Sequence, residues 1–98
     1  MGKYLLIWQL DSSRVPVDQK ERARQWAGLL GMVKKNLEKG LTKDWGLFAG
    51  EDSGYVIAEG SETEIAVMVQ QYYPFVNFET HPVMSVSQAE EVVKAMQG

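Results

Sequence analysis

The one histidine of this chain, His81, is the clearest candidate for proton transfer. It lies in the sequence Glu79-Thr80-His81-Pro82, toward the end of a predicted strand. An imidazole titrates near neutral pH and can serve as a general base or a metal ligand. Glu79 shares a strand face with His81, so its carboxylate can orient the imidazole. The alternative is a partly exposed edge-strand residue beside a charge, without catalysis.

A metal site is not expected from this composition. Catalytic metal ions usually need three or more converging ligands, whereas the chain has 1 histidine and no cysteine. Glu79, Glu59 and Asp11 fall on different predicted strands without diagnostic spacing. The glycines form no phosphate-binding loop and the serines no nucleophile motif. We therefore predict no metal and no cofactor.

Aromatic side chains are abundant, with 3 tryptophans and 4 tyrosines in 98 residues. Aromatic rings with a few polar atoms often line pockets for flat organic ligands. The candidates for such a pocket, between a sheet and its helices, are Trp8, Trp26, Trp45 and Tyr72. The alternative is that these rings simply fill the core, because Trp26 and Tyr72 fall on apolar stripes of predicted helices.

The first element that must position these residues is a strand over residues 3–11. Alternation places Tyr4, Leu6, Trp8 and Leu10 on one face and Leu5, Ile7 and Gln9 on the other. Both faces are apolar over most of the strand, which is typical of a central strand covered on both sides. The alternation of apolar residues does not show which face of this strand packs against the helices.

A long helix is predicted to follow and to run through Lys39. Asp18 and Glu21 have capping-box spacing. Gly40 suits the left-handed backbone conformation that often ends a helix. Gly28 and Gly31 weaken the helix interior, and we attribute them to close packing on the sheet. The apolar stripe of this helix consists of Ala23, Trp26, Ala27, Leu30, Val33 and Leu37.

The residue pattern in the second half of the chain predicts a hairpin, a helix, a strand and a final helix. Residues 45–50 and 55–59 alternate around turn-forming residues 51–54. Ser61 and Glu64 begin a helix that Pro74 ends, and residues 75–81 form the fourth strand. An extended segment, 82–86, leads to a helix capped by Ser87 and Glu90. Its apolar stripe is Ala89, Val92, Val93 and Met96.

This order, βαββαβ plus a terminal helix, predicts one α+β domain over residues 1–98. A hairpin between two crossover helices favours the ferredoxin-like fold with a four-stranded antiparallel sheet. The helices then cover one face and leave the other bare. An apolar face of that size exceeds what soluble monomers usually expose, so we predict a homodimer through it, with Leu5, Ile7, Trp8 and their neighbours at the interface.

In this order and patterning the chain resembles the dimeric α+β barrel superfamily. The segments that carry the resemblance are YLLIWQL, WGLFAGEDSGYVIAEG and FVNFETHPVMSV. Similar proteins include muconolactone isomerase, cofactor-independent monooxygenases and haem-degrading enzymes, whose ligand histidine lies on a helix rather than a strand. The resemblance implies two sheets that face each other, pockets between sheet and helices, and a segment 82–86 that reaches the partner subunit.

Two functions remain open. One is a ligand-binding or interaction domain without catalysis, and the other is a cofactor-independent monooxygenase or isomerase that acts on a hydrophobic or aromatic molecule through His81 and Glu79. A net charge of -3 and scattered basic residues disfavour nucleic acid. No segment reaches the ~20 apolar residues of a membrane helix, and the expected compartment is the cytoplasm.

Overall fold

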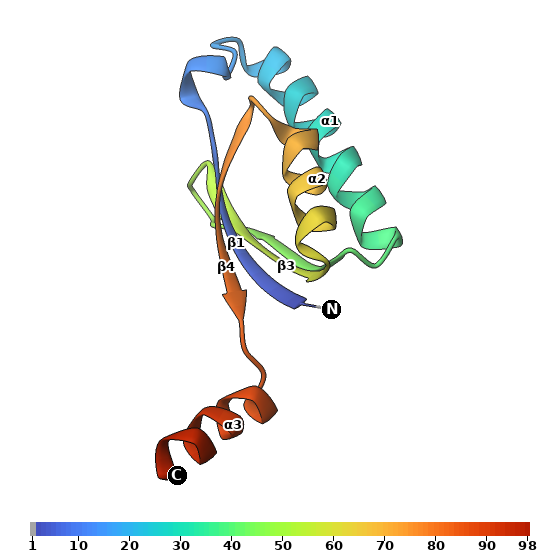
Figure 1. The fold of residues 1–98 in the computed structure, drawn as a ribbon. Helices are drawn as coiled ribbons and strands as arrows, with labels where there is room; N and C mark the ends of the chain where they lie inside the picture. The colour runs from blue at the N-terminus through green and yellow to red at the C-terminus, as the bar shows by residue number, and fades with distance from the viewer. Residues whose placement is uncertain (1) are drawn as a thin grey trace.

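The computed structural model describes residues 2–98 as four strands and three helices, with one short 3-10 turn. The order is βαββαβ plus a C-terminal helix, as predicted (Figure 1). The elements are β1 (Gly2–Leu10), η1 (Ser12–Arg14), α1 (Gln19–Glu38), β2 (Thr42–Leu47), β3 (Ser53–Gly60), α2 (Glu62–Tyr72), β4 (Val76–Val83) and α3 (Val86–Gln97).

The four strands form a single antiparallel sheet in the order β2-β3-β1-β4. This order is that of the ferredoxin-like fold, because each crossover helix returns the chain to a strand beside an earlier one. Helices α1 and α2 lie on the same side of the sheet (Figure 1). The predicted fold class is therefore confirmed, and the sheet keeps one face free of helices within the chain.

The two faces of β1 have different environments. Leu6, Trp8 and Leu10 are buried on the helix side, whereas Leu5 and Ile7 are half-buried on the open side. The prediction that Trp8 lies at the interface with Leu5 and Ile7 is therefore wrong. Because side chains alternate between the two faces of a strand, Trp8 lies on the same face as Leu6 and Leu10, under the helices.

Helix α1 begins and ends as predicted but presents a different stripe to the sheet. The Asp18 carboxylate accepts from the Glu21 N–H, and Gly40 has φ 77°. Leu37 is exposed, while its neighbour Asn36 is buried. A Cβ at Gly28 or Gly31 would meet nothing within 4 Å. Close packing therefore does not explain these two glycines, which lie on the outer surface.

The later boundaries differ from prediction at several points: β2 ends at Leu47 instead of residue 50, and in the predicted extended segment 82–86 the first two residues belong to β4 and Val86 begins α3. Strand β2 begins at Thr42, with an irregular register between Thr42 and Asp44, and β3 already begins at Ser53. Ser61 and Glu64 form the predicted capping box of α2. The box of α3 is Ser85 with Gln88 instead of Ser87 with Glu90.

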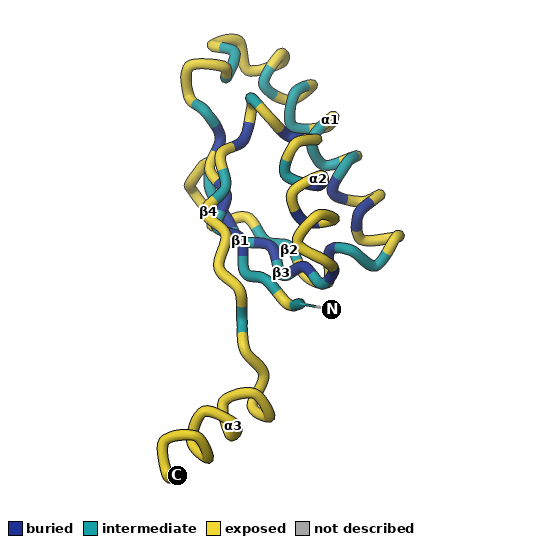
Figure 2. Tube along the Cα trace, viewed as in Figure 1, coloured by how far each residue is buried: buried dark blue, intermediate teal, exposed yellow. Residues whose placement is uncertain are grey.

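Helix α3 extends away from the rest of the domain and has no buried residue (Figure 2). Its apolar side chains Val86 and Met96 are 78% and 81% exposed. The molecule is correspondingly elongated, with extents of 60 × 25 × 20 Å. A helix of 12 residues is marginal on its own in water, so α3 needs a surface to pack against.

Candidate functional site

An aromatic crevice lies between the sheet and the helices. It encloses about 30 Å³, which is room for about two water molecules. All four predicted pocket residues line it, so the structure brings together side chains from β1, α1, β2 and α2. The lining residues are Trp8, Leu10, Trp26, Leu29, Leu30, Val33, Thr42, Trp45, Val56, Met68, Tyr72, Val76 and Phe78.

The three tryptophans form one ring cluster centred on Trp8. The Trp8 and Trp45 rings are stacked, with centroids 5.5 Å apart and an interplanar angle of 12°. Trp26 meets Trp8 edge to face at 6.3 Å and 71°. Such arrangements suit the ring quadrupoles and add to the gain from burial. The cluster offers flat apolar walls of the kind that bind planar molecules.

Gly54, predicted as a turn residue, lies in β3 and makes the stacking possible. It pairs with Trp8 across β1 and β3. A Cβ at this position would lie 2.7 Å from Trp8 Cζ2, closer than real contacts allow. The missing side chain lets the Trp8 indole lie over β3 and reach Trp45 on β2. Its place opposite Trp8 depends on strand register, so no local signal in the sequence indicates this role.

The helical wall of the crevice is not equally buried along its length. Trp26, Leu29 and Leu30 on α1 are only half-buried, whereas Val33 and Asn36 further along the helix are fully buried. Segments with few buried apolar contacts open at lower free energy than well-packed ones. The N-terminal half of α1 is therefore the less tightly packed wall of the crevice.

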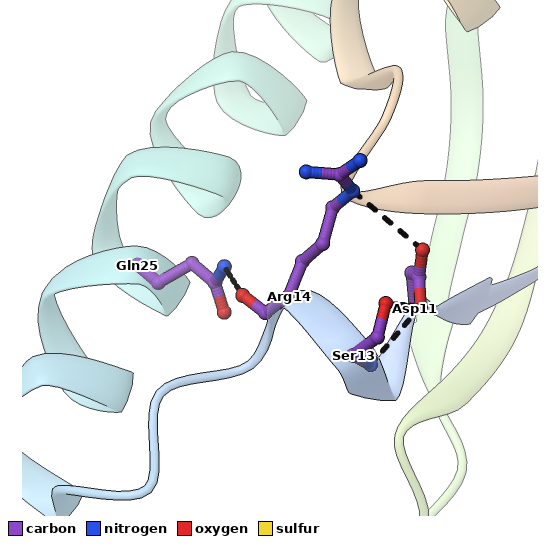
Figure 3. Close-up of polar contacts among 4 residues, drawn as sticks. All are labelled: Asp11, Ser13, Arg14 and Gln25. Atoms are coloured by element: carbon purple, nitrogen blue, oxygen red, sulfur yellow. Dashed lines mark hydrogen bonds and ion pairs between the residues drawn. The ribbon is translucent and has the colours of Figure 1, made fainter.

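A polar cluster ties the connection between β1 and α1 to the helix (Figure 3). The Asp11 carboxylate accepts from the Ser13 N–H and hydroxyl at 3.0 and 2.7 Å. These bonds hold the pKa of Asp11 below its ordinary value, with a smaller contribution from Arg14. Gln25 Nε2 donates to the Arg14 carbonyl oxygen at 2.9 Å. The cluster fixes the loop at the N-terminal end of α1 without closing the crevice.

The Tyr72 side chain is held within the helical layer by a buried hydrogen bond. Asn36 Nδ2 donates to its phenolic oxygen at 2.8 Å and lies 3.3 Å from Gln71 Oε1. Burial raises the pKa of Tyr72, and the bond from Asn36 partly opposes this. The phenol is therefore neutral at pH 7, and its ring packs edge to face on Phe78 at 5.7 Å.

His81 and Glu79 lie on the opposite side of the sheet from the crevice. They pair with Leu5 and Ile7 in register, and so share the open face. His81 Nε2 is 3.4 Å from Glu79 Oε1, and both side chains are more than half exposed. The pair therefore exists, on the edge strand β4, but the imidazole has no access to the crevice. Neither residue lines it.

No chemistry-bearing cluster replaces this pair in the described part of the chain. Within residues 2–98, no three His, Cys, Asp or Glu side chains are grouped so that they could hold a metal ion. Over the same residues, no helix has the length and apolar content needed to cross a bilayer. The four predicted pocket residues converge on the crevice, whereas His81 and Glu79 do not.

Fold and crevice define a class: a small ferredoxin-like α+β domain with an aromatic crevice under its helices. Residues 2–97 match the family described as "Domain of unknown function (DUF3303)". The chain belongs to this family, since the match covers nearly its whole length. No curated protein is significantly similar to it.

Proposed function

We propose that this domain binds a small hydrophobic or aromatic molecule in the crevice and works as a homodimer. The observation that carries the binding function is the convergence of Trp8, Trp26, Trp45 and Tyr72 on one partly open space. Apolar surfaces with a few polar atoms are the usual lining of small-molecule sites. An inert core would instead close around these rings at crystal-like density.

The enclosed volume requires that the crevice widen when a ligand enters. At about 30 Å³ it is smaller than the ~150 Å³ cavity that holds a benzene ring in a well-studied case. The half-buried side chains of Trp26, Leu29 and Leu30 make the N-terminal half of α1 the mobile wall. The ligand then supplies apolar contacts that this part of α1 lacks in the free domain.

The binding test uses α-methylstyrene, a planar apolar probe, with the tryptophan indole N–H resonances as the readout. We expect saturable shifts of these resonances. Leu29→Trp, which fills the mouth, should weaken binding at least tenfold. Leu37→Trp puts the same side chain at an exposed site on the same helix and should leave binding unchanged. Shifts that never saturate, or that are equal in both variants, would refute the binding function.

The open sheet face and α3 support the homodimer. Leu5, Ile7, Tyr55, Ile57 and Val83 are half-buried on that face, where no helix covers them. Stable interfaces bury roughly 800 Å² on each partner, and a sheet face together with an amphipathic arm offers surface of this kind. We propose that two sheets pack face to face, as a dimeric α+β barrel, and that each α3 lies on the partner.

Sedimentation equilibrium at micromolar concentration tests the dimer. The wild type should have the mass of two chains. Ile57→Asp, which places a charge on the open face, should shift it toward the monomer by tenfold or more in dissociation constant. Val17→Asp is the matched control, because Val17 is 94% exposed in the loop before α1. A monomeric wild type would exclude the proposed assembly.

The enzymatic alternative has no comparable observation in its favour. A general base must come within hydrogen-bond reach of the proton that it abstracts. His81 is on the far side of the sheet from the crevice and open to solvent. The proposed function therefore assigns His81 and Glu79 no catalytic role.

A further inference from the structure

Trp8, which lines the crevice, has a buried hydrogen-bond donor whose partner is missing. Trp8 is only 4% exposed, and its Nε1 has no hydrogen-bond partner among residues 2–98. An indole nitrogen can donate but not accept, and a buried one usually has an acceptor. An unpaired buried donor lowers stability unless something else supplies that acceptor.

The rest of the lining restricts what the acceptor can be. No Lys, Arg or His lines the crevice, so a buried carboxylate or phosphate would have no compensating charge. Two of the other polar side chains already have contacts within the domain: Tyr72 accepts from Asn36, and Thr42 Oγ1 lies 3.6 Å from Met68 Sδ. A neutral oxygen or nitrogen is therefore the acceptor that this environment tolerates.

The stacked rings restrict the shape of the molecule that carries this acceptor. Trp8 and Trp45 are nearly parallel, and Trp26 stands edge-on against Trp8. A planar ring can continue this arrangement with offset or edge-to-face contacts. A bulky, non-planar hydrocarbon would have to separate the rings.

We propose that the crevice selects a neutral, planar aromatic molecule bearing a hydrogen-bond acceptor of the aryl-ketone type, and that Trp8 Nε1–H donates to this acceptor. This inference rests on the proposed binding function, and it adds the class of ligand and the residue that recognises it. Trp8 is then a specificity residue as well as a wall of the crevice.

The test compares acetophenone with α-methylstyrene, in which a CH₂ group replaces the carbonyl oxygen. Trp8→Phe should weaken acetophenone binding about three- to tenfold more than it weakens α-methylstyrene binding, as expected for the loss of one neutral hydrogen bond in addition to the change in the crevice wall. Trp45→Phe is the matched control, because it removes an indole N–H from the stacked neighbour and should affect both probes alike. Benzoate, a carboxylate of similar shape, should not bind.

A second measurement needs no variant at position 8. The Trp8 indole proton of the wild type should move downfield with acetophenone and not with α-methylstyrene. If both probes bind and Trp8→Phe weakens them equally, or the indole proton does not distinguish them, the acceptor inference is wrong and the binding function stands. If neither probe binds, the binding function fails, and this inference fails with it.

Discussion

The indole rings of Trp8 and Trp45 stack on each other although their strands are not neighbours. Strand β3 runs between β1 and β2, and the rings meet above it at a centroid distance of 5.5 Å. Gly54 on β3 leaves the space that this requires. The central contact of the crevice thus depends on a residue with no side chain, on a third strand.

Gly54→Ala should break this stack. The added Cβ would collide with Trp8 and with the carbonyl oxygen of Gly46, and overpacking of this kind costs about 2 to 3 kcal/mol. Urea denaturation should show the lost free energy of unfolding, and near-UV circular dichroism the altered tryptophan environment. Unchanged spectra with unchanged stability would mean that the stack does not depend on Gly54.

Gly28→Ala and Gly31→Ala should each stabilise the protein by about 0.5 to 1 kcal/mol. Alanine lowers the entropy cost of the helix interior, and a Cβ at either position meets open space. Urea denaturation measures the gain. Ala27→Gly, at an exposed site on the same helix, should lose a similar amount. Destabilisation by both alanines would show that this outer surface of α1 is covered by a partner.

Hydrogen exchange should divide α1 into two halves. Amides near Trp26 and Leu29 should exchange faster than those around Val33 and Asn36, because only the second group includes fully buried side chains. Mass spectrometry of peptic fragments measures the difference. Saturating α-methylstyrene should slow the first half selectively. Equal protection along the whole helix would contradict the mobile wall.

Tyr72→Phe should cost about 1 to 2 kcal/mol, since it removes the acceptor that Asn36 Nδ2 reaches at 2.8 Å and leaves a buried donor poorly paired. Asn36→Leu in the same chain should recover part of this loss, which a double-mutant cycle measures. Tyr73→Phe is the control, because Tyr73 is 66% exposed. Strict additivity of the two substitutions would contradict a coupled pair.

Stability should fall in acid partly through Glu64. Its carboxylate accepts from the Ser61 N–H at 2.9 Å, which holds the folded-state pKa below the ordinary 4.5. A lowered folded pKa adds stability above the unfolded value, and this is lost as pH falls through the folded pKa. Glu64→Gln keeps an acceptor for the cap and should flatten the stability profile below pH 4.5.

The control for this pH prediction is Glu62→Gln. Glu62 lies in the same first turn of α2 but takes no part in the capping box. Thermal unfolding across the acid range should give this variant the same slope as the wild type. An identical slope in Glu64→Gln would show that the capping carboxylate is not responsible.

The element order could be predicted from sequence, because it follows from local periodicity, and the abundance of aromatic residues suggested the four pocket candidates. The rotation of α1 about its own axis, which decides which stripe of side chains faces the sheet, could not be predicted. Asn36 is buried because Tyr72, 36 positions along the chain, supplies its partner, and no local pattern records such a bond. Which face of β1 lies under the helices was equally hidden, since both faces are apolar.

Local signals also competed with each other. Ser85 with Gln88 and Ser87 with Glu90 both have the spacing of a capping box, and the structure uses the first pair. Gly54 has the composition of a turn residue but lies within β3, opposite Trp8. The position of Gly54 depends on strand register, which is fixed by long-range pairing.

The separation of α3 from its own domain has a consequence for the thermodynamics of this protein. In a dimer of the proposed kind, α3 gains its packing surface only when two chains meet, so helix formation and association are linked equilibria. Helical circular dichroism would then rise with total protein concentration, and the melting temperature would rise with it. The folded state of the C-terminal segment would be a property of the population of chains instead of the single chain.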